Sequence, residues 1–344
     1  MKKSLFIFAA AALVLAGCNN DVTLDENQAP VDPTAPKEIS FKALSSTPKR
    51  VQGRRAPVDG IAFTPTTMKV SAYDATHSEN FFTDVTFTKD ATTWKGGKYW
   101  PFAAGTINFL AYSELTAGSA TWNATNPASA VTLVMGDNRT AQNDLMYACG
   151  TGTVTESSGN LTFPTNVSMV FKHAQALIKF TLKAKTATEA SKITVNSITL
   201  NSVSCQGTFA VTHANWNTTQ AARDGAGDGS LDNSVSGTWD AYSGYAGNIA
   251  AVVEDGFTLS TDAQDYASLM VVPAQGMASF TINFTVNNGG TNEIYDYTYT
   301  PASTDLAQAT KYIYNITMQL HEIEIAPEIT DWASGSSNDI TVDD

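Results

Sequence analysis

The stretch Ala174-Gln175-Ala176-Leu177-Ile178-Lys179-Phe180-Thr181-Leu182 places an apolar residue at every second position. A period of two puts these side chains on one face of a β-strand. The same alternation recurs at residues 39–43, 107–111, 280–286 and 312–320, and long stretches of helical period are nearly absent. Thr, Val, Ile, Phe and Tyr fill these segments, while Gly, Asn, Asp and Ser separate them at short intervals. We therefore predict an all-β body built from antiparallel sandwich sheets.

Two shifts in the phase of the alternation predict where strands bend or change sheet. Ile193 and Val195 lie on odd positions, whereas Ile198 and Leu200 lie on even ones. A second shift falls after residue 320 and predicts a bulge or break near residues 321–322.

A domain boundary is predicted within residues 150–160, which are rich in Gly, Ser and Thr and show no core pattern. The predicted N-terminal sandwich domain spans residues 56–155, and the predicted C-terminal domain spans residues 156–344. Residues 215–237 are interpreted as a long loop inside the second domain.

The composition limits the classes of function. The chain has 344 residues, with 33 acidic and 20 basic side chains and a formal charge of −13. Because binding to phosphate groups needs clustered Lys and Arg, nucleic acid is excluded as an expected partner. The length is sufficient for about two domains with cores of their own.

The N-terminus reads as a secretory signal. Lys2 and Lys3 precede an apolar run from residue 5 to 16, which ends in Leu15-Ala16-Gly17-Cys18. This end resembles a bacterial lipobox, in which residues 1–17 are removed and Cys18 is acylated as the new first residue. The alternative is an ordinary signal peptide with an incidental cysteine. Residues 18–37 are polar and contain three prolines, so we interpret them as an extended tether.

Motifs for catalysis or metal binding are weak. Cys149 and Cys205 are predicted as two buried thiols, with one disulfide as the alternative. The loop carrying Asp224, Asp228 and Asp232 could offer oxygen ligands to calcium, but its spacing departs from the EF-hand pattern, and a solvated acidic loop is the alternative reading.

The four histidines are scattered without zinc-site spacing, and His173 is interpreted as a structural hydrogen-bonding residue. No nucleophile elbow or phosphate loop is found. We expect no enzyme activity, no catalytic residue, no metal site and no cofactor.

Tryptophans allow a different function. Exposed aromatic rings on a sandwich can stack on sugar rings, so the chain could bind glycan at a cell surface. Trp100 and Trp332 lie within or beside apolar strands and are expected in the core, whereas the sequence does not assign the other four. These are Trp94, Trp122, Trp216 and Trp239.

One basic cluster, Lys49-Arg50-Val51-Gln52-Gly53-Arg54-Arg55, stands in this acidic chain. Its flanks are rich in Ser, Pro and Gly and therefore resemble loops. Arg50, Arg54 and Arg55 are accordingly predicted to be accessible to a protease that cuts after basic residues. The alternative is a solvated basic loop with no such role.

Taken together, several segments resemble the fimbrillin family, the type V pilins of Bacteroidales. Their order and spacing span nearly the whole chain. Besides the lipobox and the strand at residues 38–41, the matching segments are residues 98–112, 144–148, 170–174, 269–275, 312–315 and 329–332.

The resemblance implies two transthyretin-like β-sandwich domains in tandem and export as a lipoprotein of the outer membrane. It also implies that an Arg-specific protease cuts after the first strand, so that residues 38–55 act as a propeptide. Loss of the strand carrying Ile39, Phe41 and Ala43 would open a groove for β-strand addition. A strand of another pilin subunit would fill it, and head-to-tail repetition would give a fimbrium.

We expect the donor strand to lie in the C-terminal tail, with Ile340 and Val342 in the vacated positions. The alternative is that this tail is the closing strand of its own domain. Three roles remain open: a structural stalk or tip pilin, a pilus anchor, and a surface lipoprotein that binds glycan without polymerising. Any ligand would lie on a host or bacterial surface.

Overall fold

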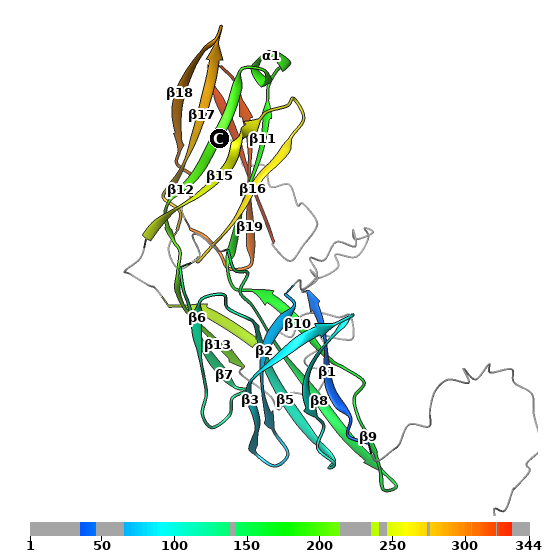
Figure 1. Ribbon diagram of the computed structural model, residues 1–344. Coiled ribbons are helices and arrows are strands. Elements are labelled where there is room, and N and C mark those ends of the chain that lie inside the picture. The colour runs from blue at the N-terminus through cyan, green and yellow to red at the C-terminus, as the bar shows by residue number, and fades with distance from the viewer. Residues whose placement is uncertain are drawn as a thin grey trace, which may run out of the picture. The chain divides into compact units, whose positions relative to one another are not determined.

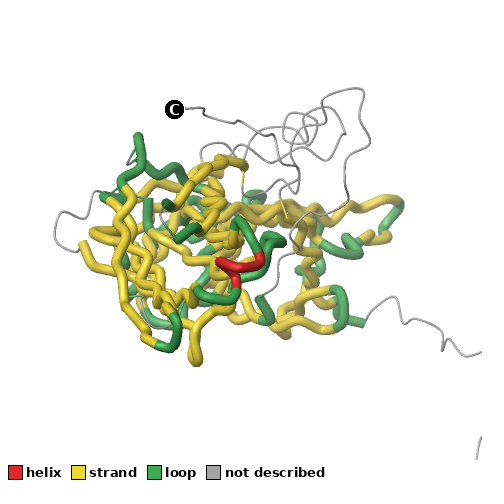
Figure 2. The backbone as a smooth tube through the Cα atoms, turned by 90° about the horizontal axis from the view of Figure 1, so that it is seen from above, coloured by secondary structure: helices red, strands yellow, loops and turns green. Residues whose placement is uncertain are grey.

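The computed structural model describes residues 35–45, 65–137, 142–213, 235–240, 246–273, 276–303, 305–320 and 322–331, with the backbone alone at 43–45, 246–247, 251–256 and 331. Regular structure in these ranges is almost entirely β-strand (Figure 2), which confirms the predicted all-β class. Helix α1 (Ala187–Ala190) is a single turn whose N-terminal Glu189 N–H is capped by Thr186 Oγ1 at 3.3 Å. Among the described residues, no helix has the length and hydropathy needed to cross a bilayer.

Seven strands of the N-terminal half close into a barrel (Figure 1). Their hydrogen-bonded order is β10-β1-β4-β3-β2-β5-β8, and β8 pairs in turn with β10, while β9 extends β8. Because the sheet is closed, each barrel strand has a partner on both sides. The bounds are β1 (Glu38–Ser45), β2 (Thr67–Asp74), β3 (Glu79–Asp90), β4 (Thr93–Tyr99), β5 (Gly105–Ser113), β8 (Met146–Ser157), β9 (Asn160–Thr162) and β10 (Val167–His173).

A four-stranded sheet covers the outside of β5 and β8. Its order is β14-β13-β7-β6, with β6 (Gly118–Trp122), β7 (Ala130–Met135), β13 (Gly207–His213) and β14 (Val235–Trp239). Leu110 and Tyr147 join Leu133 and Phe209 in one buried cluster, whereas Phe109 belongs to the cluster inside the barrel. Strand β5 is therefore buried on both faces, which explains why Leu110 and Tyr112 are apolar as well as the alternating residues Ile107, Phe109 and Ala111.

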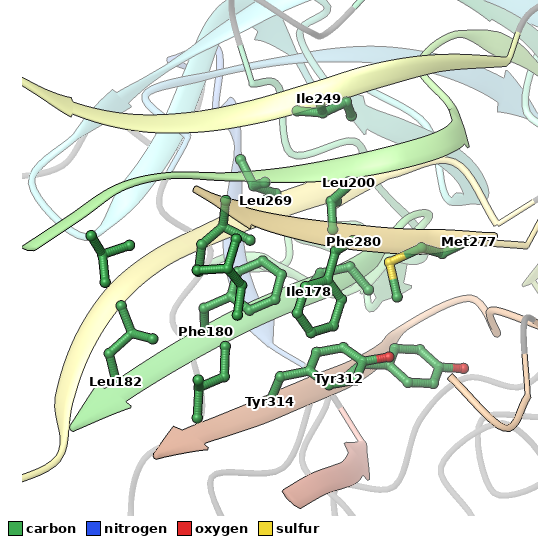
Figure 3. Packing of buried hydrophobic residues seen from close by; sticks show 14 of the residues in the cluster. Ile178, Phe180, Leu182, Leu200, Ile249, Leu269, Met277, Phe280, Tyr312 and Tyr314 are labelled. Atoms are coloured by element: carbon green, nitrogen blue, oxygen red, sulfur yellow. The ribbon is translucent and has the colours of Figure 1, made fainter. Parts of the chain in front are cut away.

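Two four-stranded sheets form the C-terminal half. One has the order β16-β11-β19-β20 and the other β15-β12-β17-β18. They share one hydrophobic cluster (Figure 3), in which the ring of Phe280 lies 5.0 Å from Phe180 and 4.9 Å from Tyr314. The bounds are β11 (Ala176–Ala184), β12 (Ile193–Ser204), β15 (Ala246–Thr258), β16 (Gln264–Val271), β17 (Ser279–Asn288), β18 (Thr291–Tyr299), β19 (Thr310–Met318) and β20 (Ile323–Asp331).

Both predicted phase shifts are confirmed. The register of β12 shifts between Val195 and Ser197 against both of its neighbours, β15 and β17. Strand β19 ends at Met318 and β20 begins at Ile323, with a hydrogen bond of 2.9 Å from Gln319 N to Glu322 O closing the turn. The second shift is therefore a hairpin rather than a bulge.

The region of the expected boundary, residues 150–160, contains a strand. The division at residues 155 and 156 falls inside β8, which pairs with β5 along residues 147–154. Its glycines are needed there for close packing: a Cβ at Gly150 would lie 2.9 Å from Val167, and one at Gly152 would lie 2.2 Å from the Trp100 ring. The chain leaves the barrel only after β10, at residues 174–175.

The positions of β13 and β14 also differ from the expected division into domains at residues 155 and 156. Their sequence follows β12 of the C-terminal half, yet β13 pairs with β7 of the N-terminal half. Such long-range pairing leaves no local sequence signal. Two pairs, β1–β10 and β11–β19, are parallel, so the sheets are not purely antiparallel as expected.

Two further sequence predictions concern buried residues. Cys149 and Cys205 are both buried and are not joined by a disulfide, which confirms the interpretation as thiols. His173 is 2% exposed, and its Nδ1 lies 2.8 Å from Asp144 Oδ1. This contact confirms a structural hydrogen-bonding role for His173.

Candidate functional site

The candidate site is centred on β1, which lies between β4 and β10 in the barrel. It runs antiparallel to β4, with Phe41 opposite Trp94, and parallel to β10, with Phe41 opposite Val167. Just before the strand, Lys37 O accepts a hydrogen bond of 2.9 Å from Trp100 N. Removing β1 would therefore leave two strands with unpaired backbone edges.

The side chains of Ile39 and Phe41 point into the barrel and are both 0% exposed. The Phe41 ring makes edge-to-face contacts with Phe87 at 4.9 Å and with Phe109 at 5.1 Å between ring centroids. We call these two rings the Phe41 cage. Ile39 and Phe41 were predicted as inward-facing residues of the first strand, and their burial confirms this orientation.

The two rings of the Phe41 cage, Phe87 and Phe109, are themselves supported by close packing contacts with other residues. The Phe87 ring packs on the backbone of Gly96, where a Cβ would lie only 2.9 Å from it. The Phe109 ring contacts Trp100 at 5.9 Å between centroids, and Trp100 in turn packs directly on Gly152. Because these aromatic rings rest on close backbone contacts, they have little freedom to collapse into a space left by Phe41.

The outward-facing residues of β1 make polar contacts that fix its position along the groove. Ser40 Oγ lies 3.0 Å from Thr165 O and 2.7 Å from Asn166 Oδ1 and can donate to either. Glu38 Oε1 accepts a hydrogen bond of 3.1 Å from Gly97 N. The site thus combines inward apolar positions with an outward hydroxyl and an outward carboxylate.

The remaining predicted site residues lie mostly outside the described residues. The backbone of Ala43 pairs with Met169, but its side chain is not among those described. Outside the described residues lie Cys18, Arg50, Arg54, Arg55, Ile340 and Val342. In the sequence, the basic cluster follows the end of β1 at Ser45 and precedes β2.

The tryptophans give little support to a sugar-binding face. Trp94 and Trp100 are 3% and 2% exposed, so neither offers a ring face to a ligand. Trp239 is half-buried, contacts Phe209 at 4.8 Å, and donates from Nε1 to Ala174 O at 2.5 Å. Trp122 is also half-buried. Trp216 and Trp332 lie outside the described residues.

No cation site emerges from the described part of the chain, where no three His, Cys, Asp or Glu side chains gather as metal ligands do. The acidic loop with Asp224, Asp228 and Asp232 lies outside that part.

One charged pair lies at the turn between β2 and β3. Asp74 is 3% exposed and accepts hydrogen bonds from Thr76 N at 2.9 Å and His77 N at 3.0 Å, while His77 Nδ1 lies 2.8 Å from Asp74 Oδ2. Burial alone would raise the pKa of Asp74, but the hydrogen bonds with His77 and Thr76 lower it below 3.8. The hydrogen bond with Asp74 raises the pKa of His77 above 6.5.

Sequence reasoning missed the residues that surround β1. Asn166 is 126 positions from Ser40. Phe87 and Phe109 belong to β3 and β5, which do not pair with β1, and no local pattern reveals that their rings contact Phe41 inside the barrel. The one available signal was the strand alternation that places Phe109 on an inward face.

Comparison with known proteins agrees with this architecture. A family model described as Fimbrillin-like matches residues 55–332. Among solved structures, the chain is similar to a fimbrial protein from Bacteroides vulgatus, at 12% identity and a TM-score of 0.53, covering 86% of this chain and 99% of the other. It is also similar to a Bacteroides uniformis protein with a suggested role in cell adhesion, at 15% identity and a TM-score of 0.50, with coverage of 86% and 99%. No curated protein matches the sequence.

Proposed function

Because this chain belongs to the Fimbrillin-like family, we propose that it is a non-enzymatic structural subunit, stalk or tip, of an adhesion filament on the cell surface. The observation that carries the proposal is the position of β1. This strand fills a groove between β4 and β10, and the basic cluster begins at Lys49, shortly after the strand ends at Ser45. One cut in that cluster separates the strand covalently from the rest of the barrel.

Export and processing follow from the N-terminal sequence. The signal peptide, residues 1–17, directs secretion, and acylated Cys18 holds the precursor at the outer membrane through the tether at residues 18–37. An Arg-specific protease then cuts after Arg50, Arg54 or Arg55. Departure of the released segment removes both the lipid anchor and β1.

The vacated groove then takes a strand from another subunit. Its two edges supply backbone hydrogen bonds, and its interior accepts alternate apolar side chains. Ile340 and Val342 in the C-terminal tail, which we define as residues 332–344, are the proposed donors. Since donor and groove are different surfaces, the contact does not close on itself and gives a filament.

The proposed subunit has two transthyretin-like sandwich domains in tandem. The strand pairing supports a first domain made of the barrel together with β6, β7, β13 and β14, and a second made of the other two sheets. In this arrangement the exchange groove belongs to the first domain, and the donor tail follows β20 of the second.

The test is to treat the full chain with an Arg-specific protease and to look for filaments by electron microscopy. Two matched variants serve as controls: one replaces Arg50, Arg54 and Arg55 by Lys, which keeps the charge, and the other lacks residues 338–344. We expect filaments from the cleaved wild-type chain alone. Filaments from the uncleaved Lys variant would refute the processing step, and filaments from the truncated chain would refute the donor assignment.

A further inference from the structure

Two segments far apart in the sequence carry the same order of side-chain types. Glu38-Ile39-Ser40-Phe41 of β1 and Asp339-Ile340-Thr341-Val342 of the C-terminal tail both read acid, Ile, hydroxyl, apolar. Resting on the proposed function, we propose that the tail of a second copy enters the groove in the register of β1. Asp339 then takes the place of Glu38, and Val342 enters the Phe41 cage. We further infer that the size of residue 342 sets the strength of the contact.

In this register, each of residues 339–342 would take over a contact or a buried position that β1 has in the structure. The exposed Gly97 N–H donates to Glu38 in the structure and would donate to the Asp339 carboxylate afterwards. Thr165 O and Asn166 Oδ1 face the Ser40 hydroxyl, which Thr341 would replace. Ile340 would fill the fully buried position of Ile39. A shift by one residue would turn the apolar side chains outward and the polar ones into the barrel.

The direction of the incoming strand follows from the two walls of the groove. Strand β1 runs parallel to β10 and antiparallel to β4, and the two arrangements have different hydrogen-bond patterns. A tail that runs in the direction of β1 keeps the antiparallel pairing with β4 at the positions of Glu38, Ser40 and Phe41, and it keeps the parallel pairing with β10 that begins at Phe41. It therefore pairs residues 339–342 with the same partners that residues 38–41 have in the structure.

Among residues 339–342, only Val342 would replace a much larger side chain, because it would enter the Phe41 cage. Val342 is smaller than Phe41, and the cage walls rest on Gly96 and Trp100, so the walls have little freedom to close around a smaller side chain. The cage therefore remains partly empty when Val342 occupies it. A larger side chain at position 342 should bind more tightly, whereas the Ile39 position is already matched by Ile340.

The register is tested by cross-linking in the full chain after Arg-specific cleavage. Because Ser40 Oγ lies 2.7 Å from Asn166 Oδ1, cysteines in the variant N166C/T341C should form a disulfide between subunits, seen as a ladder on non-reducing gels. The matched control N166C/V342C should give no ladder, since residue 342 faces the barrel interior. Filaments without a ladder in the first variant, or a ladder in the second, would overturn the register and leave strand exchange standing.

The size dependence and the direction are tested by substituting Val342 with Ala or Phe and measuring the dissociation rate of filaments in urea. We expect Val342→Phe to slow dissociation at least about tenfold and Val342→Ala to speed it. Ile340→Phe is the matched control, and it should not stabilise the filament. Equal rates for Ala, Val and Phe would overturn the role of the cage, and stabilisation by Ile340→Phe alone would show that the tail runs in the opposite direction. Absence of filaments from the cleaved wild-type chain would instead refute the proposed function itself.

Discussion

Replacing Phe41 by Ala tests how strongly β1 is held in the barrel. The ring is 0% exposed and makes two edge-to-face contacts, each worth about 0.5–1.5 kcal/mol beyond its burial. Truncation of a buried Phe to Ala costs about 3–5 kcal/mol, and the value rises with the volume of the cavity that remains. Because the cage walls have little freedom to close, we expect the cost of Phe41→Ala to lie in this range.

The measurement is hydrogen exchange of the β1 amides in the full, uncleaved chain, which reports the free energy of local opening. The control is Lys42→Ala, because the neighbouring Lys42 side chain is exposed and its loss should cost less than about 0.5 kcal/mol. Trp94 and Trp100 lie in the same buried cluster, so their fluorescence gives a second readout during urea unfolding. A loss below about 1 kcal/mol for Phe41→Ala, or an equal effect of both variants, would refute the account of the cage as a rigid pocket.

Three further predictions concern the anchor, a close packing contact and the charged turn. Cys18→Ser should abolish labelling by a fatty-acid analogue and leave the protein either as unprocessed precursor or soluble, and unchanged processing and membrane retention would contradict the lipoprotein assignment. Gly152→Ala should cost about 1–3 kcal/mol in urea unfolding, because its Cβ would lie 2.2 Å from the Trp100 ring, while a neutral effect would contradict that packing. Asp74→Asn should return the pKa of His77 toward 6.5 in an NMR titration. In the wild type the His77 side of this contact should stabilise the fold fully below pH 6.5 and lose this effect as the pH rises through the higher folded pKa of His77. The Asp74 side should lose its effect as the pH falls below 3.8 and through the lowered folded pKa of Asp74.

Local sequence pattern was sufficient where one face of a strand is buried. The alternation at Ile39 and Phe41 predicted an inward face, and the change of phase after Val195 predicted a register shift that the structure places between Val195 and Ser197. These features succeed because a period of two has a fixed relation to the two faces of a sheet. The change of phase after residue 320 predicted a bulge or break in the same way, and the structure has a hairpin between Met318 and Ile323.

Local sequence patterns were insufficient where the role of a residue depends on a partner that is distant in the sequence. Gly150 and Gly152 suggested a linker, yet they lie in the middle of β8, because Val167 and the Trp100 ring occupy the space that a Cβ would need. Glycine in a strand can thus mark the close approach of another side chain rather than an interruption. The sequence likewise gave no sign that β13 pairs with β7, since the whole of β8 to β12 lies between the two strands in the chain.

For the candidate site, the sequence predicted the strand but not its surroundings. It identified β1, the basic cluster behind it and the apolar residues of the tail. The Phe41 cage and the contacts of Ser40 with Thr165 and Asn166 required the three-dimensional arrangement. Under the proposed function, these contacts specify the register of an incoming strand at single residues.

The closed barrel explains why assembly would require cleavage under the proposed function. In the intact chain β1 pairs with both β4 and β10, so the backbone edges of these two strands that face β1 are not open to another molecule. Under the proposed function, loss of β1 removes Ile39 and Phe41 from the barrel core and leaves both backbone edges unpaired. A donor strand then stabilises the cleaved barrel by mass action, in proportion to the logarithm of its concentration above the dissociation constant. The apparent stability of cleaved subunits should accordingly rise with subunit concentration, whereas that of the uncleaved chain should not, because its groove is already filled from within the same molecule.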